Sequence, residues 1–538
     1  MLGWLDYLVL GVYLGGTVAL GLYIGRGIKT GKDYFLAGRS LPWWAVGASL
    51  VATDIGGTDI IGVGGAAYTH GLAVANFEWI GCVPAMILAA FVFVPFFWRL
   101  GVYTIPEYLE RRFHVSMRTA LAVCWLVFMA CNLGVMLFAS ATMMKVTLGL
   151  DFEGYSLAGW HLAGWEVVAG IVAMALVAGV YTFTGGLAAV VYTDSIQCAV
   201  MIGGCLLVLV MGLIEVGGLD ALQQRVAARE AEMADRTKTN GTEESREKGE
   251  HDRLILPVDT KSPFPWPGIY FGLALILSPA YWIGNQAIVQ RSLGARSEFE
   301  AKAAYVFGAL LKNIIPIVVA LPGLVAFALL SDLENGDHAF PALASRLLPS
   351  GLRGVFLAAF VAALMSSVDS YLNAAATIFT NDLYRRFVSR DASEERLLQV
   401  GRRVTLGLVA WAIAFGCWVS TIEGSGVYVI FQTLMSFFQG PALAVLVAGL
   451  FWRRANSVGA LVGFLGGIAC AVGLFALNQP AVYEALGWPP LFRIREPFLY
   501  FSVWAFLVAA GLIVAVSLAT PPQPDGKVLP LLFRRRQP

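Results

Sequence analysis

Residues 49–65 read SLVATDIGGTDIIGVGG, an apolar stretch that carries two aspartates, Asp54 and Asp59, and five glycines. An ionised carboxylate at membrane depth is costly unless it faces the protein interior or a watery cavity. Glycines weaken a helix, and broken helices occur in membrane proteins where freed backbone groups line a cavity or bind an ion. The stretch therefore predicts a discontinuous helix with a binding site at its break. The alternative is a glycine-rich packing seam whose aspartates hydrogen-bond to neighbouring helices.

The composition indicates a polytopic membrane protein. Of the 538 residues, 58% are hydrophobic and only 14% are charged, and the mean hydropathy is +0.71, which ordinary soluble domains do not reach. The basic residues are dispersed among loops, so no role in nucleic-acid binding follows. All seven cysteines fall inside apolar runs without metal-ligand spacing, so we interpret them as small buried hydrophobic residues.

Apolar runs of about 20 residues predict an all-α protein with about thirteen membrane spans. The runs cover roughly residues 5–25, 42–67, 73–98, 119–147, 164–183, 186–214, 267–290, 302–330, 353–384, 404–420, 425–451, 457–477 and 497–519. Basic residues gather in every second loop, for example Arg291, Arg296 and Lys302 in one of them. The positive-inside rule then predicts a plasma (inner) membrane protein with its N-terminus outside and its C-terminus in the cytoplasm. No signal-peptide pattern precedes the first run, so we expect that run to be retained as a helix.

One long hydrophilic segment, residues 216–265, is too charged to bury a core, and we expect it to form an extracellular loop that is mobile or partly helical. This loop is one of six parts into which we divide the chain. These are an extra N-terminal span with a cytoplasmic loop at 1–40, a first group of five spans at 41–215, the loop at 216–265, a second group of five spans at 266–452, two further spans at 453–519 and a basic cytoplasmic tail at 520–538.

A second broken span is predicted at residues 267–290. The sequence LILSPAYWIGNQ places Ser278-Pro279 and Gly284-Asn285 in mid-helix, and a proline there removes a backbone hydrogen bond. Because each broken span opens a group of five spans, the pattern indicates an inverted repeat with its site near the bilayer midplane. Such an arrangement favours alternating access over a simple channel.

Residues 362–386, AALMSSVDSYLNAAATIFTNDLYRR, predict a helix with a polar face. That face is formed, at spacings of three, four and seven residues, by Ala363, Ser366, Ser367 and Ser370. Asp369 lies beside them, and Asp194 is a further intramembrane acid that could complete or feed a cation site. Hydroxyl and carboxylate oxygens suit a monovalent cation that has shed water, but small residues also permit close helix packing, and the spacing alone does not choose between the two.

Eight stretches, taken together in this order, resemble the sodium:solute symporter family and most of all its sodium/glucose cotransporter branch. They are DYFLAGRSLPWWAVGASLVATDIGG, FEWIG, GVYTIPEYLERRF, YTFTGGLAAVVYTDSIQ, FPWPGIYFG, NQAIVQRSLGARS, LMSSVDSYLNAAATIFTNDLYRR and GLFWRRANSVGAL. The resemblance runs from about residue 33 to 480. It implies a LeuT-type fold with a five-plus-five inverted repeat, two discontinuous helices and the first span outside the repeat. It also implies secondary-active import with sodium as the coupling ion and no cofactor.

The resemblance further implies a sodium site between the first break and the serine face. Its ligands would be the carbonyl oxygens of Ala52, Ile55 and Ala363 and the hydroxyls of Ser366 and Ser367. Four further residues match positions of a second sodium site or of the sodium path in some family members, namely Asp54, Asp194, Asp369 and Ser370.

For the substrate, the resemblance to the sugar-transporting branch is partial. Glu78 and Lys312 stand where that branch has a hydrogen-bonding Glu and Lys, and Tyr281 stands where it has an aromatic inner gate. Three positions depart from the branch: Asp59 and Met435 replace glutamines, and Ser278 replaces an asparagine. Because a site built to bond hydroxyls rejects ligands that leave its polar groups unpaired, these changes predict a changed ligand. A sugar or polyol is the first expectation, and an amino acid or other small metabolite is the alternative.

Two other classes of function compete with a symporter. A membrane-embedded enzyme is disfavoured because the histidines form no cluster in the sequence and the HEXXH, GXSXG and Walker patterns are absent. A transporter-like sensor would require an appended soluble signalling domain. We therefore expect no enzymatic activity. The expected partners are a small polar solute, sodium and the lipid bilayer, with no nucleic acid and no obligatory protein partner.

Overall fold

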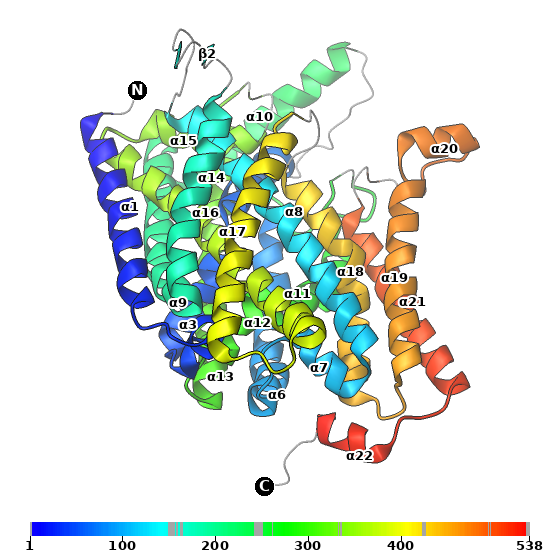
Figure 1. Ribbon diagram of the computed structural model, residues 1–538. Coiled ribbons are helices and arrows are strands. Elements are labelled where there is room, and N and C mark those ends of the chain that lie inside the picture. The colour runs from blue at the N-terminus through cyan, green and yellow to red at the C-terminus, as the bar shows by residue number, and fades with distance from the viewer. Residues whose placement is uncertain are drawn as a thin grey trace.

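The computed structural model describes residues 3–148, 156–157, 160–161, 165–240, 251–260, 262–331, 333, 336–421, 427–492, 494 and 497–533. Within these residues the fold is helical, and the only strands are β1 (Ser156–Leu157) and β2 (Trp160–His161), which pair antiparallel. Most long helices run between the two ends of a single bundle (Figure 1). This confirms the prediction of an all-α protein.

The helices up to residue 240 form in close succession. They are α1 (Trp4–Gly25), α2 (Gly31–Leu36), η1 (Ala37–Arg39), α3 (Trp43–Asp54), α4 (Gly57–His70), η2 (Leu72–Ala75), η3 (Phe77–Cys82), α5 (Val83–Leu88), η4 (Ala89–Phe93), α6 (Val94–Leu100), α7 (Ile105–Arg112), α8 (Val115–Leu148), α9 (Glu166–Val216) and α10 (Leu219–Asn240). Here η3 and η4 are π-helical stretches within one long span, whereas η1 and η2 are single 3₁₀ turns.

The remaining helices lie beyond residue 266. They are η5 (Gly268–Leu277), α11 (Ser278–Gly284), α12 (Gln286–Leu293), α13 (Glu298–Lys312), α14 (Ile315–Leu329), η6 (Gly336–His338), α15 (Ala339–Leu347), α16 (Leu352–Ile378), η7 (Phe379–Val388), α17 (Glu394–Val419), α18 (Val427–Phe451), α19 (Ser457–Leu477), α20 (Pro480–Leu486), α21 (Phe498–Ala519), α22 (Asp525–Val528) and η8 (Leu529–Leu531). Of these, η5 and η7 are π-helical, and η6 and η8 are 3₁₀ turns.

Two spans are broken, as the sequence predicts. The pair α3 and α4 bends by 53° at Ile55 and Gly56, and the run of η5 and α11 bends by 51° against α12 at Asn285. The π-helical turns of η5 end where the Ser278-Pro279 step begins, in keeping with a proline that cannot donate to the preceding turn. Both breaks lie inside the bundle rather than at its ends.

The number of spans stays a prediction. Ten helices within the described residues are long and apolar enough to cross a membrane, or twelve if each bent pair counts as one span. Gly186, with φ of 51° and ψ of −149°, interrupts the 51-residue helix α9. This backbone conformation is essentially restricted to glycine, so it divides α9 into two segments that are each long enough to span. Counting both segments reaches the predicted thirteen.

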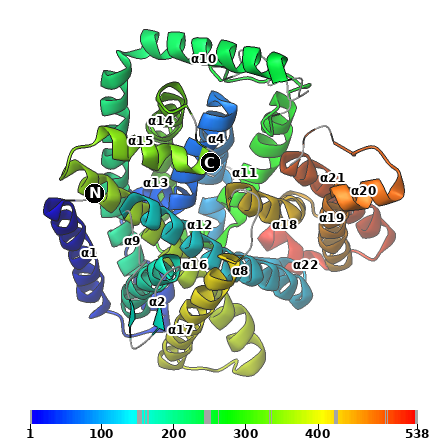
Figure 2. The ribbon, with the colours of Figure 1, turned by 90° about the horizontal axis from the view of Figure 1, so that it is seen from above.

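The helix α16 forms the centre of the bundle. Viewed from above, it is surrounded by α8, α9, α12 and α17 (Figure 2). In the span Leu352–Val388, of which α16 is the main part, 94% of the most apolar 18-residue stretch is buried. By contrast, α1 lies at the edge of the bundle, and only 11% of its most apolar 18-residue stretch is buried. The serine face of α16 is therefore a fully interior surface.

One carboxylate of the edge helix α1 forms hydrogen bonds to the start of α16. Asp6 is fully buried, and it accepts hydrogen bonds of 2.7 Å from the backbone N–H groups of Gly351 and Gly354 and one of 3.1 Å from the Ser350 hydroxyl. These donors surround the first turn of α16, whose N–H groups have no partner within the helix. Asp6 thus caps a helix that lies 345 residues further along the chain.

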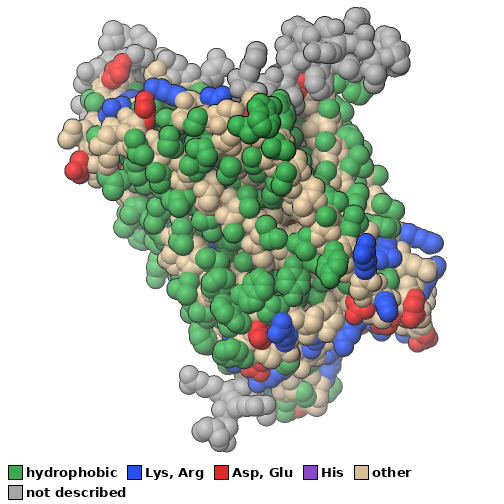
Figure 3. Space-filling view, turned by 90° about the vertical axis from the view of Figure 1, so that its left-hand side faces the viewer, with side chains coloured by type: hydrophobic (Ala, Val, Ile, Leu, Met, Phe, Trp, Pro, Cys, Tyr) green, Lys and Arg blue, Asp and Glu red, His purple; other side chains and the backbone are tan. Residues whose placement is uncertain are grey.

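The surface suits a bilayer. Figure 3 shows apolar side chains over the middle of one face, with charged side chains gathered toward the two ends. Large apolar residues such as Trp4, Phe299 and Ile214 are at least 70% exposed, which is unfavourable in water but ordinary against lipid. The start of α1 and the short helix α22 lie at opposite ends of the bundle (Figure 1), so the chain crosses it an odd number of times.

The hydrophilic segment after α9 is partly helical, as predicted. Its first part forms α10, which extends outward along one end of the bundle (Figure 2). Residues 241–250, which include the most charged part of the segment, lie outside the described residues.

Candidate functional site

The first break and the serine face of α16 meet through two hydrogen bonds, and two more link the same serines to Ala363 within α16. The Ser366 hydroxyl lies 2.7 Å from the carbonyl oxygen of Ala52 and 2.9 Å from that of Ala363. The Ser367 hydroxyl lies 3.1 Å from the carbonyl oxygen of Thr53 and 3.3 Å from that of Ala363. Four of the five predicted sodium ligands therefore lie together.

The fifth predicted ligand, Ile55, follows the end of α3. It is buried and has a non-helical backbone, with φ of −93° and ψ of 80°. A helix that ends leaves its last carbonyl groups without N–H partners, and the negative end of the helix dipole points the same way. The break therefore supplies free carbonyl oxygens beside two serine hydroxyls, which is a suitable donor set for a hard monovalent cation.

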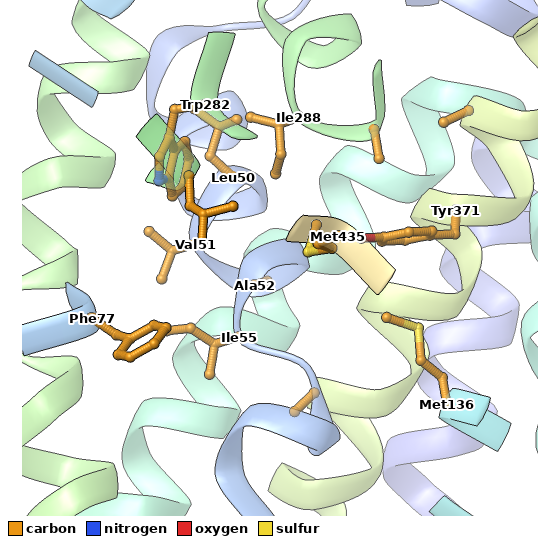
Figure 4. Packing of buried hydrophobic residues seen from close by; sticks show 14 of the residues in the cluster. Leu50, Val51, Ala52, Ile55, Phe77, Met136, Trp282, Ile288, Tyr371 and Met435 are labelled. Atoms are coloured by element: carbon orange, nitrogen blue, oxygen red, sulfur yellow. The ribbon is translucent and has the colours of Figure 1, made fainter. Parts of the chain in front are cut away.

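Apolar residues enclose this region. Figure 4 shows Ala52 and Ile55 at the break, with Phe77 and Trp282 on one side and Met435 and Tyr371 on the other. Because such an enclosure keeps bulk water away, it increases the strength of ion binding by the oxygens inside it.

Asp194 is the centre of a second polar group. It is fully buried, and its Oδ2 accepts hydrogen bonds from the Ser49 hydroxyl at 2.6 Å, from the Arg291 guanidinium at 3.2 Å and from the Thr53 hydroxyl at 3.3 Å. Arg291 is 1% exposed, although the sequence analysis placed it in a basic loop. It lies in α12, directly after the second break, which brings the two breaks together.

Asp369 and Ser370 extend this group from α16. Asp369 accepts a hydrogen bond of 2.5 Å from the Tyr181 hydroxyl and one of 3.0 Å from Ser370. The Ser370 hydroxyl lies 3.0 Å from that of Thr53 and also contacts the Arg291 guanidinium. The structure thus brings together three of the four residues predicted for a second sodium site or path.

The acids of this second group outnumber its bases. Asp194 and Asp369 carry two formal negative charges against the single positive charge of Arg291, which leaves a formal charge of −1 that one sodium ion would neutralise. Sequence reasoning missed the contributions of Ser49, Thr53, Tyr181 and Arg291. Ser49 and Thr53 could have been found from their spacing of four residues, which puts them on one face of the first broken helix.

The predicted substrate residues surround a cavity next to the first break. The cavity is partly open to solvent. Its wall is formed by Asp54, Asp59, Val63, Phe77, Glu78, Cys82, Leu273, Leu277, Ser278, Tyr281, Trp282, Gln432, Met435 and Gln439. Five of the six predicted substrate residues are in this wall, and the sixth, Lys312, lies directly behind it.

Lys312 is held by two carboxylates. Its ammonium group is fully buried, lies 2.6 Å from Oε2 of Glu78 and also contacts Asp54. It additionally lies 5.8 Å from the centre of the Trp282 ring, a favourable position for a cation. Asp54, which was predicted for the sodium path, is therefore placed with the substrate residues rather than with Asp194 and Asp369.

The acids that contact Lys312 lie close to a cysteine. Ligand atoms of Asp54, Glu78 and Cys82 lie within 4.8 Å of one another, a spacing that would permit metal binding. The Lys312 ammonium contacts both carboxylates and neutralises one of their two formal negative charges. The contacts that the structure describes for the two acids are therefore those of an ion-pair cluster with a remaining negative charge.

Comparison with known proteins now identifies the family. The family model described as the sodium:solute symporter family matches residues 34–467. The chain belongs to this family. The resemblance found in the sequence motifs is confirmed, and sodium-coupled transport of a small solute is the activity of the family.

Two relatives of this symporter illustrate the likeness. A sodium/glucose cotransporter from Vibrio parahaemolyticus is 35% identical over 514 residues, which cover 90% of this chain and 88% of the relative. A sodium/myo-inositol cotransporter 2 from Oryctolagus cuniculus is 34% identical over 561 residues, which cover 99% of this chain and 79% of the relative.

A solved structure establishes the fold of the symporter. A Na⁺-coupled sialic acid symporter in a substrate-bound, outward-open state is 22% identical and matches with a TM-score of 0.77, covering 97% of this chain and 99% of that one. The LeuT-type fold expected from the sequence is thereby confirmed.

Proposed function

We propose that this symporter imports a sugar or polyol across the plasma (inner) membrane together with sodium, by alternating access. Its N-terminus then lies outside and its C-terminus in the cytoplasm. The named relatives that transport glucose or myo-inositol support a polyhydroxylated solute. The cavity supports it as well, because Glu78, Ser278 and Tyr281 offer hydrogen-bonding groups on an otherwise apolar and aromatic wall.

One observation carries the proposal: the segment from Ala52 to Asp59 belongs to both sites. Its first carbonyl groups contact Ser366 and Ser367 on α16, while Asp54 and Asp59, a few residues on, line the cavity. Sodium held between this segment and α16 fixes the conformation of the break, and hence the position of both acids. Occupation of one site therefore changes the affinity of the other, and the effect is reciprocal.

Alternating access follows from the same geometry. The ion joins α3 to α16, and these are the helices that must separate when the site opens to the other side. Sodium then favours one conformation by its differential affinity for the two. The six-part division of the chain, with inverted repeats at 41–215 and 266–452, belongs to this proposal because two broken helices of this kind are typical of such repeats.

For the ions, we assign the main sodium to Ala52, Ile55, Ala363, Ser366 and Ser367. A second sodium, or the sodium path, is assigned to Asp194, Asp369 and Ser370, where the formal charge of −1 supports a cation. No residue is given a catalytic role, and sodium is the only ion that the mechanism requires.

The test is uptake by proteoliposomes that contain the purified chain. A panel of labelled sugars, polyols and amino acids is offered with an inward sodium gradient, and with potassium in place of sodium as the control. We expect accumulation of at least one sugar or polyol only with the sodium gradient. Uptake that is equal in sodium and potassium would contradict symport. Sodium-dependent uptake of amino acids alone would contradict the choice of solute.

A further inference from the structure

The solute itself can be specified further, and this inference rests on the proposed function. We propose that the solute carries a protonated amine on a polyhydroxylated frame, as in an amino sugar or an aminocyclitol, and that Asp59 binds the amine. Asp59 is then the residue that determines specificity, because it adds a carboxylate to the cavity wall.

The charge balance of the cavity is the first support. Three carboxylates, those of Asp54, Asp59 and Glu78, are in its wall, and among the described residues the only basic group in contact with them is Lys312. Three negative charges and one positive charge leave a formal charge of −2. A buried surplus of negative charge is unfavourable unless a proton or another cation neutralises it. A neutral sugar would leave the whole surplus in place.

The position of Asp59 is the second support. Lys312 lies between Asp54 and Glu78 and contacts both, but in the part of the chain that the structure describes no basic side chain forms an ion pair with Asp59. One oxygen of Asp59, Oδ2, accepts a hydrogen bond of 2.9 Å from the backbone N–H of Gly56 and thereby caps the first turn of α4. This bond uses one lone pair of one oxygen. The carboxylate therefore retains acceptor capacity on the cavity side.

Capping alone does not explain an aspartate at this position. Asp59 is the third residue of α4, and an asparagine oxygen there could accept the same hydrogen bond from Gly56. The charge of Asp59 interacts favourably with the helix dipole, and it also remains available to a ligand that enters the cavity.

A third observation points to hydroxyl groups on the same ligand. Gln439 lines the cavity, is 2% exposed, and its Nε2 has no hydrogen-bond partner. A buried amide donor without a partner is unfavourable, and a hydrogen bond to a ligand oxygen would remove that cost. Gln432 lines the same cavity and adds a second amide. The site thus joins an acid for an ammonium group to amides for hydroxyl oxygens.

The same charges disfavour a solute with a carboxylate. Lys312 is already in contact with two acids and would have to leave one of them to bind a third, and no other cation is in the described wall. Amino acids and acidic sugars are therefore excluded from the proposal, although a simple amine-bearing polyol is not.

The experiment compares matched pairs of ligands in proteoliposomes. D-glucosamine is measured against D-glucose, and D-galactosamine against D-galactose, with sodium present and in mildly acidic buffer that keeps the amines protonated. N-acetyl-D-glucosamine is included because it keeps the nitrogen and loses the charge. We expect the protonated amine of at least one pair to be preferred over its hydroxyl counterpart by roughly 10- to 100-fold, the range of a hydrogen bond to a charged group.

The decisive variant is Asp59→Asn, which removes the charge and keeps the cap. We expect the ratio of amine to hydroxyl affinity to fall by at least tenfold. Met435→Gln makes the same wall more polar without adding a charge, and it should change the affinities for both members of a pair by the same factor. Asp220→Asn, an exposed position on α10, is the matched control for loss of an acid elsewhere.

The outcomes separate this inference from the proposed function. Sodium-dependent uptake of neutral sugars with no preference for amines, and an unchanged ratio in Asp59→Asn, would overturn the inference and leave symport intact. Failure of every ligand to show sodium-dependent uptake would overturn both.

Discussion

Ser366 and Ser367 use their hydroxyls in two ways. As the structure shows them, each hydroxyl contacts one carbonyl oxygen in the last turn of α3 and the carbonyl of Ala363 in its own helix. An ion placed among these oxygens would turn each hydroxyl so that its lone pair faces the ion. Under the proposed function, the same atoms act both as packing contacts and as sodium ligands, which is why spacing alone could not decide between the two uses.

At this scale we predict that Ser367→Ala lowers the apparent sodium affinity roughly 5- to 150-fold, because a bond to a charged group worth about 1–3 kcal/mol is lost. Solute binding should recover at saturating sodium. Isothermal titration over a sodium series measures both. Ser140→Ala is the matched control, since the Ser140 hydroxyl is buried and bonds only to Met136 in its own helix, and its sodium affinity should be unchanged. Unaltered sodium dependence in both Ser366→Ala and Ser367→Ala would show that this face is for packing only.

The site residues could be identified from the sequence, but the side chains that they contact could not. Two sets of predicted residues lie together as expected. The first is four of the predicted sodium ligands, Ala52, Ala363, Ser366 and Ser367, and the second is five residues of the cavity wall. The contact between Arg291 and Asp194 was missed, because a charge count over loops cannot tell a surface arginine from one that the second break turns inward. The pairing of Asp54 with Lys312 was missed for a similar reason, since it joins residues 258 positions apart.

At the scale of the helices, the breaks follow from residue type. A proline and a Gly-Asn step account for the second break, and glycines account for the first. The break in α9 was foreseen only as a boundary between two spans, and the structure gives its cause. Gly186 has a left-handed φ, and a Cβ atom at this position would lie 2.4 Å from the carbonyl oxygen of Tyr34. The close approach of α2 to α9 therefore depends on this glycine.

We predict that Gly186→Ala destabilises the protein by roughly 1–3 kcal/mol from backbone strain alone, and by more where Tyr34 cannot move away. Thermal unfolding in detergent, followed by size-exclusion chromatography with fluorescence detection, measures the loss. Gly203→Ala in the same helix is the matched control, because a Cβ atom there has open space within 4 Å. Equal stability of the two variants would contradict the role given to Gly186.

On the scale of the whole molecule, the fold was the most predictable level. Long apolar runs and two glycine- or proline-rich breaks indicate a helical membrane protein with an inverted repeat, and the resemblance to the family implies its LeuT type. The sequence also separates the two spans that α9 joins without a polar loop, at residues 164–183 and 186–214, and the structure interrupts α9 at Gly186. The orientation of the protein in the membrane is predicted from the basic residues of the loops and not from the packing of the helices.

We therefore predict that Asp220→Cys in α10 and Asp391→Cys before α17, each in a variant without the native cysteines, react with an impermeant thiol reagent from opposite sides. Both positions are exposed, and three predicted spans separate them. Position 220 should react from outside in intact cells, and position 391 only after the cells are opened. Reaction of both from the same side would contradict the topology and the inverted repeat.

The contact between Asp6 and the start of α16 has a consequence for biosynthesis. At roughly 5–20 residues per second, a ribosome needs about 20–70 s to add the 345 residues that separate this acid from its backbone partners. During that interval the first helix already contains its carboxylate, while the N–H groups that bind it have not yet been made. The earliest helix of the nascent chain can therefore reach its final contacts only after most of the protein has been translated, so assembly of the bundle around α16 is completed late in synthesis.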